Sequence, residues 1–344
     1  MIQRGPALTI SKIAARVLAD KGAYKRLDDG YTRVDPIAIA ESEDIDVMAR
    51  PMDKLLGAFL REERVGILLN SDRPTGMLHM TCAHELGHFY LGHETTADMQ
   101  IDYQSKADNK ELTADFFAHS LMAPLRMVTN VLNGQCWKWQ DMREPAIVYQ
   151  LSLRLGLSYT AMVWSLVRMK RLDDATAKKI ANVQPAQLKQ AIVPKGTILK
   201  PTQDVWHIGP RDKDFILEPR PNDRMFMDLE SHASAGYLWT VDEAAAEGYR
   251  LKLITVDGGH HSARGTANLP VGGSATVRYE LQPKDPDALN VVTKPELVEF
   301  KETQPWNRSA SEPTKFALKT QFEVLPDGLA EATRERLVQR TSES

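Results

Sequence analysis

The sequence predicts an α+β protein of two domains, a mainly helical domain followed by an all-β sandwich, and three observations carry this prediction. The chain has 344 residues, more than one hydrophobic core usually serves. Apolar residues recur at helical spacing up to about residue 183. From about residue 197 they alternate with polar residues, as on strands with one buried face.

The domain limits follow from this change of pattern. We expect a helical domain at 1–183, a linker with two prolines at 184–196, a β-sandwich at 197–325 and a C-terminal tail at 326–344. In the first domain, residues 10–19, 110–124 and 147–172 are predicted helices, and 64–70 is a predicted strand that ends in a turn. The tail is expected to form a short helix that frays into solvent.

Seven short segments of the second domain are expected to be strands, and clusters of Gly, Pro and Asp separate them. Seven strands at this spacing are typical of a β-sandwich. The predicted strands are 214–219, 224–230, 237–241, 250–256, 275–281, 297–302 and 315–324.

Composition excludes several classes of protein. Apolar residues make up 42% of the chain, charged residues 26%, and the formal net charge is −3. This mixture lacks the basic surface that binds nucleic acid, so no direct nucleic-acid binding is expected. No segment has the length of a membrane span, and the N-terminus lacks the apolar core of a signal peptide. Because only Cys82 and Cys136 are present, there is no disulfide framework, and we expect a cytoplasmic protein without a membrane partner.

Residues 84–88 read His-Glu-Leu-Gly-His, a spacing that predicts a metal site. On a helix, His84 and His88 project from the same face and can bind one ion. Glu85 lies one step around the helix, where it can act on a bound water without being a ligand. Zinc is the expected ion, although Mn²⁺ or another divalent ion could replace it. The alternative is a pair of satisfied histidines on an ordinary helix.

A metal site needs a third protein ligand, and the helix predicted at 110–124 offers one. Its apolar residues Leu112, Phe116, Phe117 and Leu121 indicate burial. Glu111 and Asp115 share one face, and burying two carboxylates without partners is costly. We expect Glu111 to complete a His-His-Glu site and Asp115 to accept the second ring proton of a ligating histidine. A solvated acidic edge is the alternative, and His93 is expected to be exposed.

The first half resembles the ImmA/IrrE family of metallopeptidases over most of residues 8–183. Four blocks carry the resemblance in the family's order. They are "VDPIAIAESEDIDV" from Val34; Thr81 with the run Ala83 to His88; Glu111, Ala114, Phe117, Ala118 and Pro124; and "LSLRLGLSYTAMVWSLVRM" from Leu151. Many family members carry Asn where this chain has Asp115.

This resemblance implies a zincin-like metallopeptidase domain. It implies that His84, His88 and Glu111 bind the metal and that Glu85 is the base. Characterised relatives are linked to cleavage or inactivation of helix-turn-helix repressors in phage, mobile elements or stress responses. The implied protein is an intracellular zinc endopeptidase whose substrate is a protein, such as a transcriptional repressor.

The second half resembles the chagasin-type inhibitors of cysteine peptidases, which have an immunoglobulin-like β-sandwich fold. Three loops match: "SHASAGYLWTV" from Ser231, "LPVGGSATVRYEL" from Leu269, and Gln304-Pro305-Trp306. The resemblance implies partner-binding loops that contain Gly236, Tyr237, Trp239, Pro305 and Trp306. Two departures stand out, since Ala233-Ser234-Ala235 replaces a Thr-rich tip and Gln304 replaces Arg. Alternatively, Trp239 and Trp306 are packing anchors of the sandwich.

Three hypotheses therefore describe the whole chain. In the first, a zinc endopeptidase uses its β-domain to recruit substrate or gate the site. In the second, a non-proteolytic, metal-containing regulator binds a partner peptidase through its chagasin-like domain. In the third, contact between the two domains blocks the peptidase cleft until a signal arrives. Glu85 favours the first, because a structural metal site needs no base. The sequence offers His79, Tyr103 and His119 as oxyanion donors without selecting one.

Overall fold

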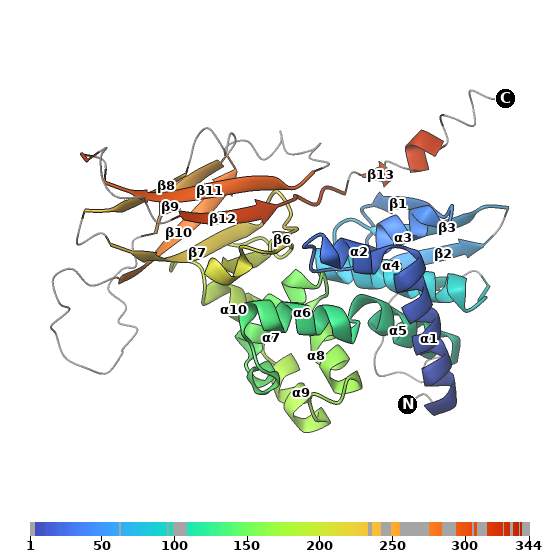
Figure 1. Ribbon diagram of the computed structural model, residues 1–344. Coiled ribbons are helices and arrows are strands. Elements are labelled where there is room, and N and C mark those ends of the chain that lie inside the picture. The colour runs from blue at the N-terminus through green and yellow to red at the C-terminus, as the bar shows by residue number, and fades with distance from the viewer. Residues whose placement is uncertain are drawn as a thin grey trace. The chain divides into compact units, whose positions relative to one another are not determined.

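In the computed structural model, the chain divides into two units that differ in secondary structure (Figure 1). The first unit comprises residues 1–133, 137–185 and 325–344, and the second comprises 134–136 and 186–324. An α+β multidomain protein is therefore confirmed. The structure describes residues 4–61, 63–94, 96–98, 109–232, 236–241, 249–254, 275–283, 294–304, 306–307, 315–325, 327–330, 333–336 and 338.

The first unit is mainly helical. Helix α3 shows how its sequence starts a helix, because the Asp35 carboxylate accepts hydrogen bonds from the backbone N–H groups of Ile37 and Ala38, with Pro36 at the first helical position. Across the described part of the chain, no helix combines the length and hydropathy needed to cross a membrane. The helices are α1 (Arg4–Asp20), α2 (Ala23–Asp28), α3 (Pro36–Ser42), α4 (Thr75–Tyr90), α5 (Asn109–Met122), α6 (Leu125–Gln135), the 3₁₀-helix η1 (Trp139–Arg143), α7 (Pro145–Arg154), α8 (Tyr159–Arg168) and α9 (Asp174–Ala181).

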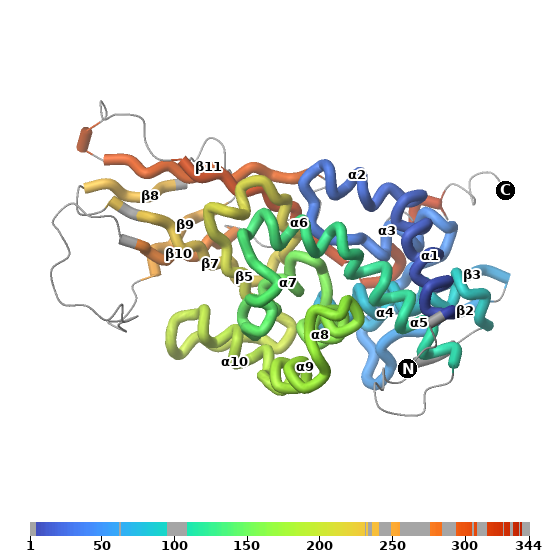
Figure 2. The backbone as a smooth tube through the Cα atoms, turned by 60° about the horizontal axis from the view of Figure 1, so that its bottom comes forward, coloured from blue at the N-terminus to red at the C-terminus, as the bar shows by residue number. Residues whose placement is uncertain are grey.

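A five-stranded sheet accompanies these helices. Its strands are β1 (Asp46–Arg50), β2 (Gly57–Arg61), β3 (Val65–Asn70), β4 (Thr96–Asp98) and β13 (Gly328–Leu329), in the order β13-β1-β3-β2-β4. Strands β1 and β3 run parallel, and the other neighbours are antiparallel. Helix α4 contacts β2 and β3 on one side and α5 on another, and α5 also contacts α1 (Figure 2). The sheet and α5 together hold α4 in the interior of the unit.

The C-terminal tail belongs to the first unit. Strand β13 pairs with β1 through Met48 with Leu329 and Ala49 with Gly328. The backbone N–H of Ala330 donates to the Val47 carbonyl at 2.9 Å. Residues 333–336 are helical, as the sequence predicts. The expectation that this helix frays is wrong for its described residues, since they dock beside β1.

Two residues hold the helical turn of the tail in place. Thr333 is buried, and its hydroxyl accepts a hydrogen bond from the backbone N–H of Val47 at 3.3 Å. Arg336 donates to the Asp44 carboxylate at 2.8 Å and to the Ile45 carbonyl at 3.1 Å. These contacts fall on residues 44–47, at the start of β1, which is the strand that pairs with β13.

The second unit consists of two four-stranded sheets, ordered β5-β7-β10-β9 and β6-β12-β11-β8. Its elements are α10 (Pro185–Gln190), β5 (Val205–Ile208), the 3₁₀-helix η2 (Pro210–Asp212), β6 (Ile216–Leu217), β7 (Arg224–Ser231), β8 (Leu238–Val241), β9 (Tyr249–Leu253), β10 (Ala275–Pro283), β11 (Glu296–Thr303) and β12 (Lys315–Thr320). Each predicted strand overlaps an observed one, and β5 is an addition. Strands β5 and β6 pair in parallel with β7 and β12, and the other neighbours are antiparallel.

The two sheets pack against each other as a sandwich. The indole N–H of Trp239 on β8 donates to the Glu230 carbonyl on β7 at 2.9 Å. The Tyr249 hydroxyl on β9 donates to Glu296 on β11 at 2.7 Å. Both bonds join one sheet to the other. Between the sheets lie buried apolar side chains that include Met225, Met227, Leu281, Val298, Phe300 and Leu318.

The segment predicted as a linker, 184–196, contributes to the core of the second unit. It contains α10, and its buried Val193 packs with Val205 and Phe226. The ammonium of Lys189 lies 3.1 Å from the Asp204 carboxylate and donates to the Gln203 carbonyl at 2.6 Å. The main segment of the second unit therefore begins at residue 186, before the alternating pattern that starts at about residue 197.

Candidate metal centre

Helix α4 places both motif histidines in the interior. His84, Glu85 and His88 are all buried, and Glu85 is 0% exposed. The helix ends at Tyr90, Gly92 just after it has a left-handed φ of 72°, and the backbone N–H of His93 donates to the His88 carbonyl at 2.9 Å. This is the Schellman arrangement that glycine favours after a helix. It returns the chain over the last turn of α4, so that His93 reaches His88.

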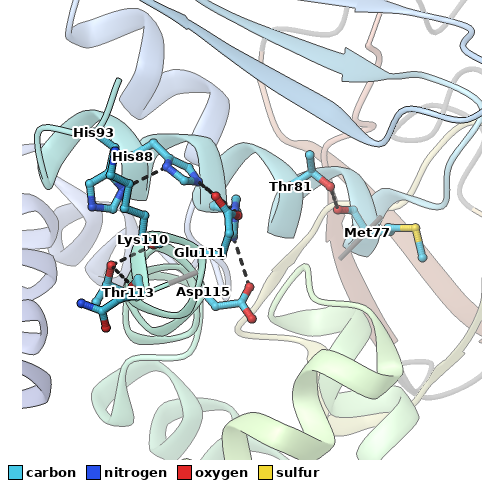
Figure 3. Close-up of polar contacts among 10 residues, drawn as sticks. Met77, Thr81, His88, His93, Lys110, Glu111, Thr113 and Asp115 are labelled. Atoms are coloured by element: carbon cyan, nitrogen blue, oxygen red, sulfur yellow. Dashed lines mark hydrogen bonds and ion pairs between the residues drawn. The ribbon is translucent and has the colours of Figure 1, made fainter. Parts of the chain in front are cut away.

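Helix α5 supplies two carboxylates to the same place. Glu111 lies 3.1 Å from His84 Nε2 and 3.6 Å from His88 Nε2 through its two oxygens. Figure 3 shows Glu111 of α5 directed toward the His88 ring. Phe117 and Leu121 are buried as predicted and fix this helix, whereas Leu112 is 37% exposed, which corrects the expectation of its burial. The packing of α5 against α4 therefore brings Glu111 to the histidine pair.

The three side chains fit a small divalent cation. The Nε2 atoms of His84 and His88 lie 3.0 Å apart, and the ligand atoms of His84, His88 and Glu111 all lie within 4.8 Å of one another. Ligands of a tetrahedral zinc ion, at about 2.0–2.1 Å from the metal, stand about 3.3 Å apart. Two nitrogens and one carboxylate also match the donor set that zinc accepts at sites with a free position for water.

Each histidine has its second ring nitrogen held by a neighbour. Asp115 lies 3.1 Å from Nδ1 of His84. Nδ1 of His93 lies 2.9 Å from Nδ1 of His88, and Figure 3 shows these two rings side by side. An Nδ1–H donated outward leaves the Nε2 lone pair directed at the centre, which is the orientation that metal binding requires. The sequence predicts the Asp115 contact. The expectation that His93 is exposed is wrong, because His93 is half-buried against His88.

Electrostatics agree with these roles. The His84 and His88 rings beside it hold the pKa of the Glu111 carboxyl well below its usual range. Burial, and then the charge of His88, lower the pKa of His93. Glu111 is therefore an anion and His93 a neutral acceptor near neutral pH.

Gly57 makes room for the side of α4 that carries Thr81 and Glu85. A Cβ added at Gly57, the first residue of β2, would lie 2.4 Å from Cγ2 of Thr81 and 3.2 Å from Oε1 of Glu85. The backbone of β2 thus comes too close to α4 for any side chain at this position. The sequence carries no signal for this contact, because Gly57 and Glu85 approach only in the folded sheet.

The residues considered as oxyanion donors have other contacts. His79 is buried against Arg33, and its Nδ1 lies 3.1 Å from the Gly156 carbonyl. His119 Nδ1 lies 2.8 Å from the Ser165 hydroxyl. Tyr103 lies outside the described residues. The role of oxyanion donor therefore remains unassigned.

The loop residues of the second unit differ in exposure. Trp239 is 7% exposed, as the packing alternative expects, whereas Trp306 is 70% exposed. The Trp306 ring covers Gly236, where an added Cβ would lie 2.1 Å from Cζ2. The Tyr237 ring stands edge-on to that of His232 at 6.4 Å. Pro305 and the tip Ala233 to Ala235 lie outside the described residues.

A comparison with models of protein families found a match within the first unit. Residues 40–163 match the family model described as the IrrE N-terminal-like domain, Peptidase_M78. This confirms the metallopeptidase resemblance over that range and supports a metal-dependent peptidase. The comparison with curated proteins gave no match.

Two solved structures are similar to part of the chain. The cysteine protease inhibitor EhICP2 from Entamoeba histolytica is 14% identical, covers 36% of this chain and 100% of its own, and has a TM-score of 0.24. The solution structure of amebosin is 16% identical, covers 35% of this chain and 98% of its own, and has a TM-score of 0.25.

Proposed function

We propose that the IrrE N-terminal-like domain of this chain is an active zinc-dependent endopeptidase. His84, His88 and Glu111 are the proposed ligands, and Glu85 is the proposed general base. One observation carries the proposal. The ligand atoms of the three residues lie within 4.8 Å of one another, and the fully buried Glu85 follows directly after one of these residues, His84, on α4. A structural metal site would have no use for that glutamate.

The chain's own groups divide the work of peptide hydrolysis. Zinc, when bound, acts as a Lewis acid and lowers the pKa of water. Glu85 accepts the proton of the attacking water and delivers it to the leaving amide nitrogen. Asp115 and His93 keep the two imidazoles in the tautomer whose Nε2 lone pairs face the centre. Burial of Glu85 keeps bulk water from competing for the proton.

The proposed substrate is a regulatory protein, such as a helix-turn-helix repressor, and the β-domain recruits this substrate or gates the site. The family match supports a protein substrate. The exposed indole of Trp306 supports a contact role for the β-domain, because a large aromatic side chain at the surface is typical of binding sites. We propose an intracellular setting for this activity.

A second candidate is a non-proteolytic regulator that contains the metal and whose β-domain binds a partner peptidase. The same exposed Trp306 favours it. Gln304 counts against tight inhibition, because it cannot replace the charged, planar donor of an arginine. Nanomolar inhibition of a papain-like enzyme by the full chain, lost in Trp306→Ala, would select this candidate.

Glu85→Gln tests the leading proposal. The full chain is purified with zinc and incubated with helix-turn-helix repressors that it cleaves on co-expression. Wild type and Glu85→Gln should each hold one zinc per chain, and the variant should cleave about 10²–10⁴-fold more slowly, since Gln cannot accept the proton. Glu94→Gln, an exposed change just after α4, is the matched control. Parental cleavage by Glu85→Gln, or a wild-type chain that takes up no zinc, would refute the mechanism.

A further inference from the structure

A cavity in the first unit lies apart from the residues of the candidate metal centre. Its volume is 440 Å³, within the range of small-molecule sites. None of its described lining residues is His84, His88, Glu111 or Asp115. Helices α1, α5, α6 and α8 contribute side chains to its wall, among them Leu18, Phe116, His119, Arg126, Ser165 and Arg168.

His119 is the unusual member of this wall. Its side chain is 3% exposed, and its Nε2 atom is buried without a hydrogen-bond partner among the described residues. Buried polar atoms in folded proteins nearly always have a partner, and an exception calls for a missing group. Because the cavity adjoins His119, a ligand within it can supply that group.

The hydrogen bonds around His119 define what that group must be. The Ser165 hydroxyl donates to the Ala161 carbonyl at 2.8 Å, so its oxygen accepts from Nδ1–H of His119, also at 2.8 Å. A neutral imidazole that donates through Nδ1 carries a lone pair on Nε2. Burial, together with the charge of Arg168, lowers the pKa of His119, which keeps the ring neutral. Nε2 therefore requires an O–H or N–H donor.

The rest of the wall adds two further requirements. Arg126 and Arg168 are its charged residues, and no acidic side chain occurs in the described lining, although Arg126 also donates to the Asp28 carboxylate beyond the wall at 3.1 Å. Arg126 lies 4.8 Å from the centre of the Tyr24 ring, and Tyr24 and Phe116 also line the cavity. An anionic group suits the arginines, and a flat apolar body suits the aromatic wall.

We propose that this cavity binds a small aromatic anion whose O–H or N–H group donates a hydrogen bond to His119 Nε2. The anionic group faces Arg126 and Arg168, and the ring lies along Tyr24 and Phe116. The proposal is independent of proteolysis, since it uses none of the proposed catalytic residues. It assigns the first unit a ligand site in addition to its metal centre.

The test uses matched probes on the full chain. 4-Hydroxyphenylpropanoate carries both required groups, 4-methoxyphenylpropanoate lacks the donor, and 4-hydroxyphenylpropanamide lacks the charge. Calorimetric titration should give weaker binding of each analogue by about tenfold, because each loses one hydrogen-bonded or charged contact. Arg168→Gln, an exposed change, should weaken the acid about tenfold, and Lys178→Gln on α9, which does not line the cavity, should not.

Nuclear magnetic resonance of ¹⁵N-histidine provides a readout that needs no buried substitution. His119 should show a non-protonated Nε2 in the free chain, and that resonance should shift on addition of 4-hydroxyphenylpropanoate but not of its methoxy analogue. The proposal is overturned if His119 carries its proton on Nε2, if hydroxy and methoxy probes bind equally, or if 4-hydroxyphenylpropanoate fails to bind at millimolar concentration.

Discussion

Buried polar groups are organised differently in the two units. In the first unit, the Nε2 atoms of His84 and His88 approach each other at 3.0 Å, although two lone pairs repel unless a proton or cation separates them. In the second unit, two carboxylates instead meet groups of opposite charge, since Asp228 meets Arg278 at 2.6 Å and the buried Glu302 meets His232 at 2.8 Å. Convergent groups of one kind indicate a place for a cation, whereas opposite pairs satisfy themselves and indicate structure.

The largest expected effect is on metal binding in the first unit. Glu111→Ala removes one of three ligands and should weaken zinc binding by at least about 100-fold, more than the loss of an outer partner does. The zinc-free variant should unfold near the temperature of the zinc-free parent, because Glu111 is only half-buried. Competition with a chelator measures affinity, and calorimetry measures unfolding. Full zinc retention by Glu111→Ala would remove Glu111 from the site.

The next largest effect on zinc binding distinguishes Asp115 from His93, the two residues that contact the Nδ1 atoms of His84 and His88. Asp115→Ala and His93→Ala should each weaken zinc binding by about 10–100-fold, since each frees one ligating ring to rotate. Asp115→Ala should have the larger effect, because an anion stabilises the ligating imidazole more than a neutral ring does. Asp115→Asn should restore much of the loss by accepting the same hydrogen bond. Unchanged affinity in both alanine variants would mean that the ligands are fixed by packing alone.

An effect of intermediate size is expected on the stability of the second unit. Metal binding should not change. Asp228 accepts two hydrogen bonds from Arg278, at 2.6 and 2.7 Å, and lies 2.8 Å from His207 Nε2. Asp228→Ala should lower the free energy of unfolding by about 1–3 kcal/mol, because it leaves the guanidinium without its partner. Zinc stoichiometry should stay at the parental value. Loss of zinc from this variant would break the contrast between the units.

The same carboxylate predicts a pH dependence. Burial alone would raise the pKa of Asp228, but hydrogen bonds from Arg278 and His207 hold that pKa well below its usual range. Its folded-state pKa is therefore lower than the unfolded value of about 3.9, so its stabilisation is present above that pH and is lost as pH falls further. Denaturation curves from pH 6 down to about pH 2 should show a shallower acid limb below about pH 4 for Asp228→Asn than for the parent.

The smallest expected effect concerns the tail. Arg336→Gln should lower the free energy of unfolding of the first unit by about 0.5–1 kcal/mol, because the ion pair to Asp44 is largely at the surface. Arg334→Gln, an exposed change in the same turn, is the control. Hydrogen exchange at the Val47 amide, which bonds to Thr333, reports on the docked tail directly. Equal exchange in the parent and Arg336→Gln would mean that β13 holds the tail unaided.

Sequence periodicity could predict the candidate site because its main groups are spaced by helical turns. His84 with His88, and Glu111 with Asp115, each share a helix face whatever the rest of the fold does. His93 could not be predicted in this way, because the left-handed turn at Gly92 reverses the chain direction that the spacing assumes.

Strands β13 and β5 could not be predicted from the sequence, because neither has a long enough alternating pattern of its own. Strand β13 has two residues and pairs with a strand from the other end of the chain, so its own neighbours carry no alternating pattern. Strand β5 is similarly short, with one partly exposed position between buried ones. Longer strands such as β10 and β12 alternate clearly, which is why their positions were predictable.

The docked tail makes the second unit an insertion into the first, not an appendage to it. Its main segment, 186–324, is joined at both ends to the first unit, one end at residue 185 and the other at 325. A single proteolytic nick near residue 190 would leave the two fragments associated, because β13, Thr333 and Arg336 would still hold the C-terminal fragment on β1. Release of the β-sandwich therefore takes two cuts, and a recombinant peptidase that stops at residue 190 would have β1 as an uncovered sheet edge, open to pairing with other chains.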